Sequence, residues 1–426
     1  MEVSIISTEI IKPSSPTPDH LRIYKLSLLD QISSQKYYTF IHFYSGPSCT
    51  ATHHLKIKTA LSNTLTHYYP FAGRVHQDGY SILCDDTGAT FIEAKVSGDV
   101  SDLLKPPQNH LIEQLVPQQQ STTSHETLLA VQLNHFNCGG VAISVGFRHV
   151  VADAVAAANF IKTWATLASS ATAADITYNV VYDCTSIFPP QDLSGVPINH
   201  IRSSQGISLK RFVFDCTNIS ALRQEFGNQT TRFQVLAALV WGAVIAAKRA
   251  TIHEYEPNAM SIATLPINLR NKTDSLSPPI PDQCIGNIIS PAIAFCPIKD
   301  TVDYKILATK LQESISRINM ESVKKTSADG SRLLRGRGTS KNTNQRSMLM
   351  ISSLCRLPFY DTDFGWGKPV WVTIVRPEYD DSAVFFDTRD GKGIELWIQL
   401  PEQDMAVFEQ DPTILAYASF NPSVPV

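Results

Sequence analysis

A stretch without hydrophobic periodicity divides this chain of 426 residues into two halves. From Ser186 to Lys210 the sequence is rich in Pro, Ser, Gly and Asn, which is typical of a linker. A chain of this length also exceeds what one hydrophobic core usually supports. We therefore predict two lobes, residues 1–190 and 211–426, joined by a linker over residues 191–210.

Both halves alternate strand-like and helix-like patterns, which predicts an α/β fold. The expected strands are residues 23–30, 38–44, 79–86, 89–96, 128–134, 141–147, 261–266 and 288–295. The expected helices are residues 55–65, 154–168, 235–247 and 304–318. Because Asp86-Thr87-Gly88 is a turn sequence, we expect the strands on either side of it to pair as a hairpin.

Charge and hydropathy exclude several classes of partner. The 36 Lys and Arg residues against 39 Asp and Glu residues give a formal net charge of -3. The chain therefore has no excess of positive charge to attract the phosphate backbone of a nucleic acid. The longest apolar run, Val235 to Ala247, is shorter than the roughly 20 residues that span a bilayer. We interpret it as a buried core helix and expect no membrane partner.

The N-terminus and the cysteines indicate a cytoplasmic protein. Glu2, Glu9 and early prolines interrupt the first residues before any apolar stretch of signal-peptide length. The 8 cysteines are scattered, with no C-x-x-C pair and no histidine at metal-ligand spacing. We expect free thiols in a reducing compartment and no bound metal.

The motif His149-Val-Val-Ala-Asp153 is the first candidate for chemistry. The histidine follows a predicted strand and the aspartate opens a predicted helix. A histidine in such a loop can be partly exposed and can serve as a general base for an alcohol or an amine. Since an H-x-x-x-D match arises easily by chance, a structural histidine remains an equal alternative at this point.

A second candidate is the turn Asp363-Phe-Gly-Trp-Gly367, in which glycines, aromatics and an acid indicate a constrained backbone. Its first residues match the kinase D-F-G, but the other kinase motifs are missing. The sequence also lacks the P-loop, the dinucleotide-binding G-x-G-x-x-G and the G-x-S-x-G elbow of serine hydrolases. Kinases, P-loop nucleotide-binding proteins, dinucleotide-binding enzymes with this motif and serine hydrolases with this elbow are therefore excluded.

The two motifs together resemble the signature of the plant BAHD acyl-CoA-dependent acyltransferases. The likeness extends along nearly the whole chain, and it is closest to the members that acetylate alkaloid hydroxyls. The other matching segments are KPSSPTP (12–18), LSLLDQ (26–31), LTHYYPFAGRV (65–75), CDDTGATFIEA (84–94), FNCGG (136–140), INLR (267–270), IGN (285–287) and DFGWGKPVWV (363–372).

The resemblance implies a CoA-dependent acyltransferase fold of two similar lobes, each a mixed sheet flanked by helices, with a channel between them. It implies that His149 is the general base in that channel and that Asp153 turns away from it to pair with Arg270. The co-substrate would be acetyl-CoA or another acyl-CoA, with no permanently bound cofactor, and the protein would be a monomer.

For the second motif, the resemblance implies that Asp363 fixes the fold of the CoA channel, together with Gly365 and Gly367. Trp366 is a further candidate, because its indole N–H could stabilise the oxyanion. The residues that bind CoA are not predicted. The basic stretch from Lys324 to Arg346 is either a solvated loop or a loop that helps to hold an anionic ligand.

Two positions depart from the family pattern. Arg148 stands where Ser is common, and Ala154 stands where Gly often follows the aspartate. A cation directed at His149 would weaken the base, but neighbours on an extended segment alternate faces, so we expect Arg148 to point away. Ala154 is a good residue for the start of a helix, so we expect activity to be retained.

The predicted function is acyl transfer from acetyl-CoA to a hydroxyl of an alkaloid or a related plant specialised metabolite. Two alternatives remain open. The first is the same fold with a benzoyl, hydroxycinnamoyl or malonyl donor, or with an amine acceptor. The second is a non-catalytic relative that only binds ligands.

Overall fold

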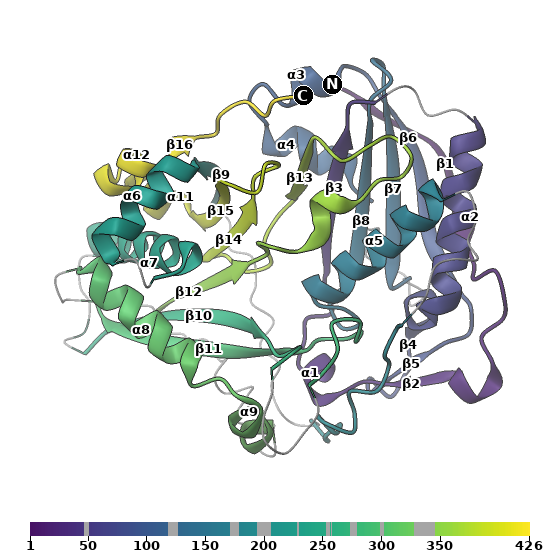
Figure 1. Ribbon diagram of the computed structural model, residues 1–426, viewed down its shortest axis with the longest axis horizontal. Coiled ribbons are helices and arrows are strands. Elements are labelled where there is room, and N and C mark those ends of the chain that lie inside the picture. The colour runs from purple at the N-terminus through teal and green to yellow at the C-terminus, as the bar shows by residue number, and fades with distance from the viewer. Residues whose placement is uncertain are drawn as a thin grey trace.

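The computed structural model describes residues 1–46, 51–117, 127–170, 179–193, 206–227, 230–252, 256, 258–272, 279–298, 302–327 and 346–426. Two sheets, each covered by helices, form two lobes that lie side by side (Figure 1). The predicted α/β fold with two lobes of mixed sheet is confirmed.

The first lobe is built on a mixed sheet with the strand order β1-β6-β7-β8-β3-β13. Its strands are β1 (Val3–Ile11), β3 (Tyr37–Tyr44), β6 (Ala89–Val96), β7 (Leu129–Phe136), β8 (Val141–Arg148) and β13 (Trp371–Ile374). The pair β6 and β7 is parallel, and the other neighbours are antiparallel. Helices α2 (Ala51–His67) and α5 (Ala154–Ser169) pack against each other over one face of the sheet (Figure 1).

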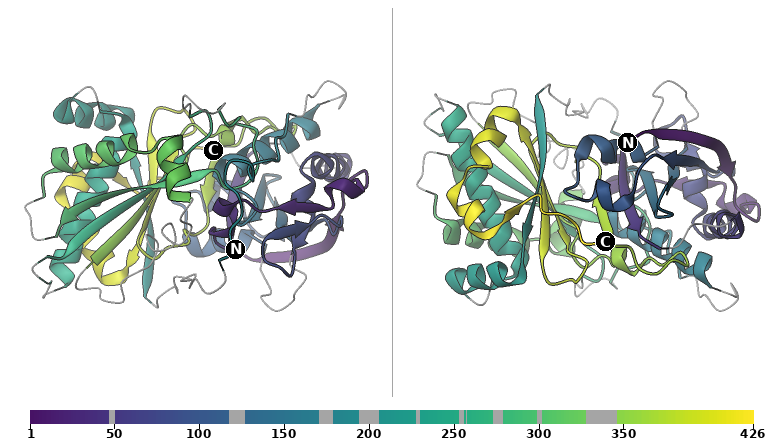
Figure 2. Two further views of the ribbon diagram at one scale, coloured as in Figure 1. Left: turned by 90° about the horizontal axis from the view of Figure 1, so that it is seen from below. Right: turned by 90° about the horizontal axis from the view of Figure 1, so that it is seen from above.

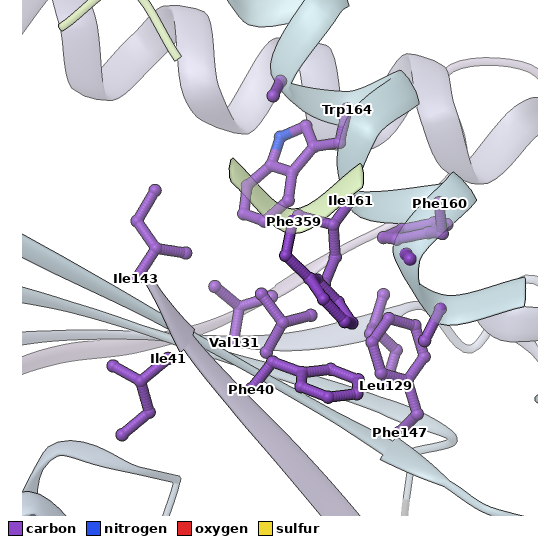
Figure 3. Packing of buried hydrophobic residues seen from close by; sticks show 14 of the residues in the cluster. Phe40, Ile41, Leu129, Val131, Ile143, Phe147, Phe160, Ile161, Trp164 and Phe359 are labelled. Carbon is purple, nitrogen blue, oxygen red and sulfur yellow. The ribbon is translucent and has the colours of Figure 1, made fainter. Parts of the chain in front are cut away.

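The core of the first lobe lies between this sheet and α5. Phe160, Ile161 and Trp164 recur at helical spacing on α5 and are fully buried, and they face Val131 and Phe147 of the sheet (Figure 3). Burial of each such side chain stabilises the fold by about 1.5–3 kcal/mol. This packing holds the first turn of α5, and with it Asp153, against the end of β8.

The second lobe is built on a sheet with the strand order β11-β10-β12-β14-β15-β9-β16. Its strands are β9 (Ile207–Phe214), β10 (Met260–Asn268), β11 (Ile289–Pro297), β12 (Arg346–Ser353), β14 (Ser382–Asp387), β15 (Ile394–Pro401) and β16 (Ser419–Phe420). Its helices are α6 (Cys216–Phe226), α7 (Arg232–Thr251), α8 (Tyr304–Ser316), α11 (Glu402–Phe408) and α12 (Pro412–Tyr417). They cover the face of the sheet that points away from the first lobe (Figure 2).

Helix α7 is the central helix of the second lobe. By length and composition alone it could cross a membrane, but 72% of its most apolar window is buried inside the protein. Gly242 lets it approach α8, because a Cβ at this position would lie 2.4 Å from the ring of Tyr304. The interpretation of residues 235–247 as a buried core helix is confirmed.

The remaining elements are short. A small sheet has the order β2-β5-β4, with β2 (Ile23–Lys25), β4 (Arg74–Val75) and β5 (Ser81–Leu83). The short helices are η1 (Asp19–Leu21), α1 (Leu28–Gln31), η2 (Tyr69–Ala72), α3 (Val100–Leu103), α4 (Asn109–Ile112), η3 (Glu113–Leu115), α9 (Met320–Ser327) and η5 (Pro358–Asp361).

Two local predictions are wrong. The expected hairpin around residues 86–88 does not form, because β5 pairs with β2 and β4 whereas β6 pairs with β1 and β7. Asp86 and Gly88 have positive φ and turn the chain from one sheet to the other. The expected strand over residues 23–30 ends at Lys25, since Ser27 and Asp30 form a capping box that starts α1.

The structure also departs from the predicted lobe boundaries. The segment with η5 and β13 follows the second-lobe strand β12 in sequence, yet β13 pairs with β3 at the edge of the first sheet. Strand β9 begins at Ile207, inside the predicted linker. Residues 194–205 of that linker and residues 328–345 of the basic stretch lie outside the described residues.

Candidate active site

His149 lies immediately after β8, at the junction of the two lobes. Its backbone N–H donates a hydrogen bond of 2.9 Å to the carbonyl of Lys36. Its ring packs 4.8 Å from the ring of Tyr38, whose hydroxyl donates to the carbonyls of Ala152 and Asp153. His149 is half-buried, and these contacts hold its ring in place.

Asn287 of the second lobe fixes the tautomer of this imidazole. Its Nδ2 donates to the carbonyl of His149 at 2.7 Å and to a carboxylate oxygen of Asp30 at 3.0 Å. Both partners are acceptors only, so the other end of the amide, Oδ1, faces Nδ1 of His149 at 2.9 Å. Nδ1 must therefore carry the hydrogen, so that in the neutral imidazole the lone pair is on Nε2.

Nε2 has no hydrogen-bond partner among the described residues. Arg148, the unusual neighbour, donates through Nε to the carbonyl of Gln35 at 3.1 Å, so it is engaged on the preceding loop. The arrangement supplies one basic nitrogen with a free lone pair at the boundary between the lobes. Such a group can remove a proton from a bound hydroxyl.

Asp153 forms a buried ion pair with Arg270. Nη1 of Arg270 lies 2.7 Å from Oδ2 of Asp153, and the two side chains are 0% and 4% exposed. Asp153 also caps α5 through the N–H of Ala156 and accepts from the N–H of Ile288. Because both carboxylate oxygens are used in this way, Asp153 makes an architectural contact between the lobes, and among the described residues its hydrogen bonds do not include the imidazole of His149.

The guanidinium of Arg270 extends this clamp to the segment that carries Asn287. It donates to the carbonyl of Cys284 through Nε and Nη2 at 3.0 and 2.8 Å, and to that of Gly286 at 3.2 Å. The N–H of Asp153 donates to the same Gly286 carbonyl. Second-lobe residues 284–288 are thereby fixed against the first turn of α5.

Asp363 organises its own loop. Its Oδ1 accepts the N–H groups of Gly365 at 2.7 Å and of Gly367 at 2.9 Å. Both glycines have a positive φ, 101° and 86°, which side chains disfavour. Phe364 anchors the loop by packing 4.7 Å from the ring of Trp164 on α5.

The structure does not bring Trp366 to His149. Its ring packs 5.4 Å from Tyr44 at one end of β3, whereas His149 packs on Tyr38 near the other end. Six residues of extended strand separate these two contacts, or about 20 Å. The indole N–H, which is buried without a described partner, is therefore too far away to stabilise an oxyanion formed at His149.

Comparison with known proteins identifies the family. A profile described as the Transferase family matches residues 1–415. The chain belongs to this family. It is a BAHD acyl-CoA-dependent acyltransferase, with acyl-CoA as co-substrate and a small-molecule acceptor.

Full-length relatives support this assignment. The chain is 42% identical to limonoid 1-O-acetyltransferase of Citrus sinensis, with 100% of each chain covered. It is 31% identical to vinorine synthase of Rauvolfia serpentina, with 98% of each covered. The crystal structure of vinorine synthase matches with a TM-score of 0.84 at 29% identity over 100% of both chains. The structure of F. graminearum TRI101 complexed with coenzyme A and deoxynivalenol shares the fold, with a TM-score of 0.70 at 16% identity.

Three residues of the site in this BAHD acyltransferase, Asn287, Asp30 and Tyr38, could not be assigned a role from the sequence. Asn287 lies in the I-G-N segment and Asp30 in the L-S-L-L-D-Q segment, and both were matched only as family likeness. A signal for Asp30 was present, because Ser27-x-x-Asp30 is a capping-box pattern. Tyr38 carried no signal, since it differs in no visible way from the other aromatics of β3.

One polar cluster of the BAHD acyltransferase lies away from the site. His54, Glu93 and His135, from α2, β6 and β7, place their ligand atoms within 4.8 Å of one another. Burial, together with His54, lowers the pKa of His135 to about 4, so its ring stays neutral. Lys58 already binds the Glu93 carboxylate and links it to Glu9, so the cluster is explained as a charge network between α2 and the sheet.

Proposed function

We propose that this enzyme acetylates a hydroxyl of a bulky polycyclic plant alcohol of the limonoid type, using acetyl-CoA. The relatives from Citrus sinensis and Melia azedarach that carry limonoid acetyltransferase names are 38–42% identical over the whole chain. The relatives named for alkaloid chemistry are 31–34% identical. The gap in identity favours a limonoid acceptor over the alkaloid acceptor expected from the sequence motifs.

The observation that carries the catalytic part of the proposal is the free Nε2 of a half-buried histidine whose Nδ1 is fixed by hydrogen bonding. An unactivated alcohol holds almost no alkoxide at neutral pH. Nε2 takes the hydroxyl proton as the oxygen attacks the thioester carbonyl, and the C–S bond then breaks. The imidazolium returns the proton to the CoA sulfur, which restores the neutral histidine and completes the transfer.

The magnitude of each contribution is consistent with this chemistry. General-base action supplies about 10²–10⁴-fold in rate. Holding thioester and hydroxyl together in one site can supply more, because effective molarities reach about 10⁵ M and above. The mechanism needs neither an acyl-enzyme nor a metal ion to balance its atoms and charges.

A substrate panel tests the proposal. The purified protein is incubated with acetyl-CoA and either a limonoid alcohol or an indole-alkaloid alcohol, and products are detected by mass spectrometry as the gain of one acetyl group. We expect turnover of the limonoid alcohol, and a rate lower by at least about 10²-fold for His149→Ala. Exclusive turnover of the alkaloid, of another acyl-CoA or of an amine would replace the proposed substrates, and no turnover of any pair would favour a ligand-binding relative.

We also propose a monomer, on the strength of the family likeness, and a cytoplasmic location, on the strength of the scattered cysteines. Native mass spectrometry tests the first part and a fluorescent fusion tests the second. A dimer at micromolar concentration or a secretory location would refute them.

A further inference from the structure

Asp30 is a buried carboxylate that the acyl-transfer steps above do not use. It is 1% exposed, and its two oxygens serve different lobes. Oδ2 accepts the backbone N–H and the hydroxyl of Ser27 at 3.0 and 2.7 Å, which closes the capping box of α1. Oδ1 accepts the backbone N–H and the side-chain amide of Asn287 at 2.6 and 3.0 Å.

These contacts favour the ionised form of Asp30. Three of the four groups that face it, the backbone N–H groups of Ser27 and Asn287 and the amide of Asn287, can only donate, and the hydroxyl of Ser27 donates to a carboxylate. Burial raises the pKa of Asp30, while the hydrogen bonds from Ser27 and Asn287 act in the opposite direction and favour the charged form. A buried negative charge is therefore linked to the amide that holds His149.

Gly286 gives independent evidence that this carboxylate shapes the segment carrying Asn287. Its φ is +93°, and an added Cβ would lie 3.1 and 3.3 Å from the two oxygens of Asp30. The backbone thus approaches the carboxylate as closely as a residue without a side chain allows. This approach delivers the N–H and the amide of Asn287 to Oδ1.

Other charged groups near His149 contribute less. Asp153 and Arg270 neutralise each other in their ion pair, and the Nε–H of Arg148 is directed to Gln35. Tyr38 is neutral, because burial raises its pKa well above the usual value. Among the described residues, Asp30 is the anion whose hydrogen-bond path reaches the imidazole, through the amide of Asn287.

We propose that Asp30 is a positioning residue for acyl transfer. Its carboxylate orients and polarises the amide of Asn287, so that Oδ1 of Asn287 holds His149 in the Nδ1–H tautomer and stabilises the imidazolium that forms as the hydroxyl loses its proton. This inference rests on the proposed role of His149 as general base. In other catalytic sites a carboxylate that is bonded directly to the histidine orients the ring and stabilises the imidazolium. Here we assign that role to a hydrogen-bonded chain of Asp30, Asn287 and His149 that is shared between the lobes.

Substitution of Asp30 tests the proposal. Asp30→Asn keeps the shape and can still accept from Asn287, but it removes the charge. We expect kcat to fall about 10- to 100-fold, as for partners that orient a functional histidine, with KM for both substrates changed less than about 3-fold. The acid limb of the kcat/KM profile should move to lower pH, because the imidazolium loses its stabilising anion.

Two controls separate positioning from folding. Ser27→Ala removes a donor to Oδ2 and weakens the cap of α1, but it leaves the Oδ1–Asn287 contacts in place, so its kcat should stay within about 3-fold of wild type. In an Asn287→Ala background, Asp30→Asn should lower kcat by less than about 2-fold further, because the hydrogen-bond path from Asp30 to His149 is already broken. Wild-type kinetics for Asp30→Asn, equal losses for Ser27→Ala, or additive losses in the double variant would overturn the proposal.

A measurement on the wild-type protein covers the case in which Asp30→Asn does not fold. Nitrogen-15 NMR of labelled histidine reports which ring nitrogen of His149 carries the hydrogen, with His149→Ala used to assign the signal. A hydrogen on Nδ1 is expected, and one on Nε2 would contradict the proposal. Because this result needs no substrate, it stays informative even where the limonoid assay fails.

Discussion

At the scale of single residues, we expect His149, the proposed general base, to contribute to the rate and little to the stability. Its ring makes one hydrogen bond and is half-buried, so His149→Ala should leave the melting temperature within a few degrees of wild type. Transfer should fall by at least about 10²-fold, because the hydroxyl proton has no acceptor. Steady-state rates and a thermal melt of the same preparation check this. Residual turnover within 10-fold of wild type would assign the base to another group.

Asp153 should behave in the opposite way. Asp153→Ala removes the partner of a buried guanidinium and the cap of α5. Loss of one member of a buried pair costs about 3–5 kcal/mol, and the cap adds about 1. We expect the free energy of unfolding in urea to fall by that amount, with a loss of rate as residues 284–288 lose their anchor. An exposed control, Asp19→Ala, should change neither quantity.

Sequence reasoning could find the members of the site whose signal is local. His149 and Asp153 stand in one short motif at a strand-to-helix junction, and Arg270 followed from family likeness. Asn287 reaches Asp30 across 257 positions of the chain and His149 across 138. Such contacts leave no periodic or compositional trace, so the orientation of the base could not be predicted.

At the scale of elements, β3 separates the two motifs. One face of this strand presents Tyr38 to His149 and Tyr44 to Trp366, so the second motif acts on the far end of the sheet. Asp363 holds two glycine N–H groups there. These bonds fix a turn, and the part of Asp363 in the fold of a CoA channel stays a prediction.

Asp363→Ala should therefore loosen the loop without altering the base. We expect a loss of about 1 kcal/mol in unfolding free energy and faster hydrogen exchange at Gly365 and Gly367, because two charge-assisted bonds to a partly exposed carboxylate are lost. The pH profile of kcat/KM should match wild type. A displaced acid limb would show that this carboxylate acts on His149. Asp361→Ala, which removes an exposed ion pair, is the matched control.

Helices and strands could be predicted where buried residues recur periodically along the sequence. The predictions failed where strand pairing depends on residues that are far apart in the chain. Helices α5, α7 and α8 and strands β10 and β11 lie close to their expected positions. The strand that follows Gly88 was expected to pair with its neighbour in sequence, but it adds to another sheet. Strand β13 completes the first sheet from the far end of the chain, because β3 offers it an open edge.

At the scale of the whole molecule, the lobes are joined by further buried polar contacts besides those of residues 284–288. Glu395 of β15 accepts from Arg211 at 2.7 Å and from the indole of Trp371 on β13 at 3.1 Å. The C-terminal end returns to the first lobe, where the N–H of Val424 donates to the carbonyl of Leu104. A site whose base and orienting amide come from different lobes requires such a rigid junction.

The stability of the whole molecule should depend on pH through His42. This histidine of β3 is 0% exposed, neither ring nitrogen has a described partner, and burial lowers its pKa to about 3. Below its ordinary pKa of about 6.5, the unfolded chain takes up a proton that the folded chain does not accept until about pH 3. The free energy of unfolding therefore falls as the pH drops through this window, by about 1.4 kcal/mol per pH unit.

Replacing His42 by leucine tests this dependence. Between pH 7.5 and pH 5 the wild-type protein should lose about 2 kcal/mol through His42 alone, and His42→Leu should lose that much less over the same interval. Urea unfolding at the two pH values measures the difference, with the exposed His20→Leu as control. Equal pH dependence of His42→Leu and wild type would mean that the folded protein protonates His42 or admits water to it. Phe40 and His42 of β3 would then be packed less tightly against Phe359 than the distances between their rings indicate.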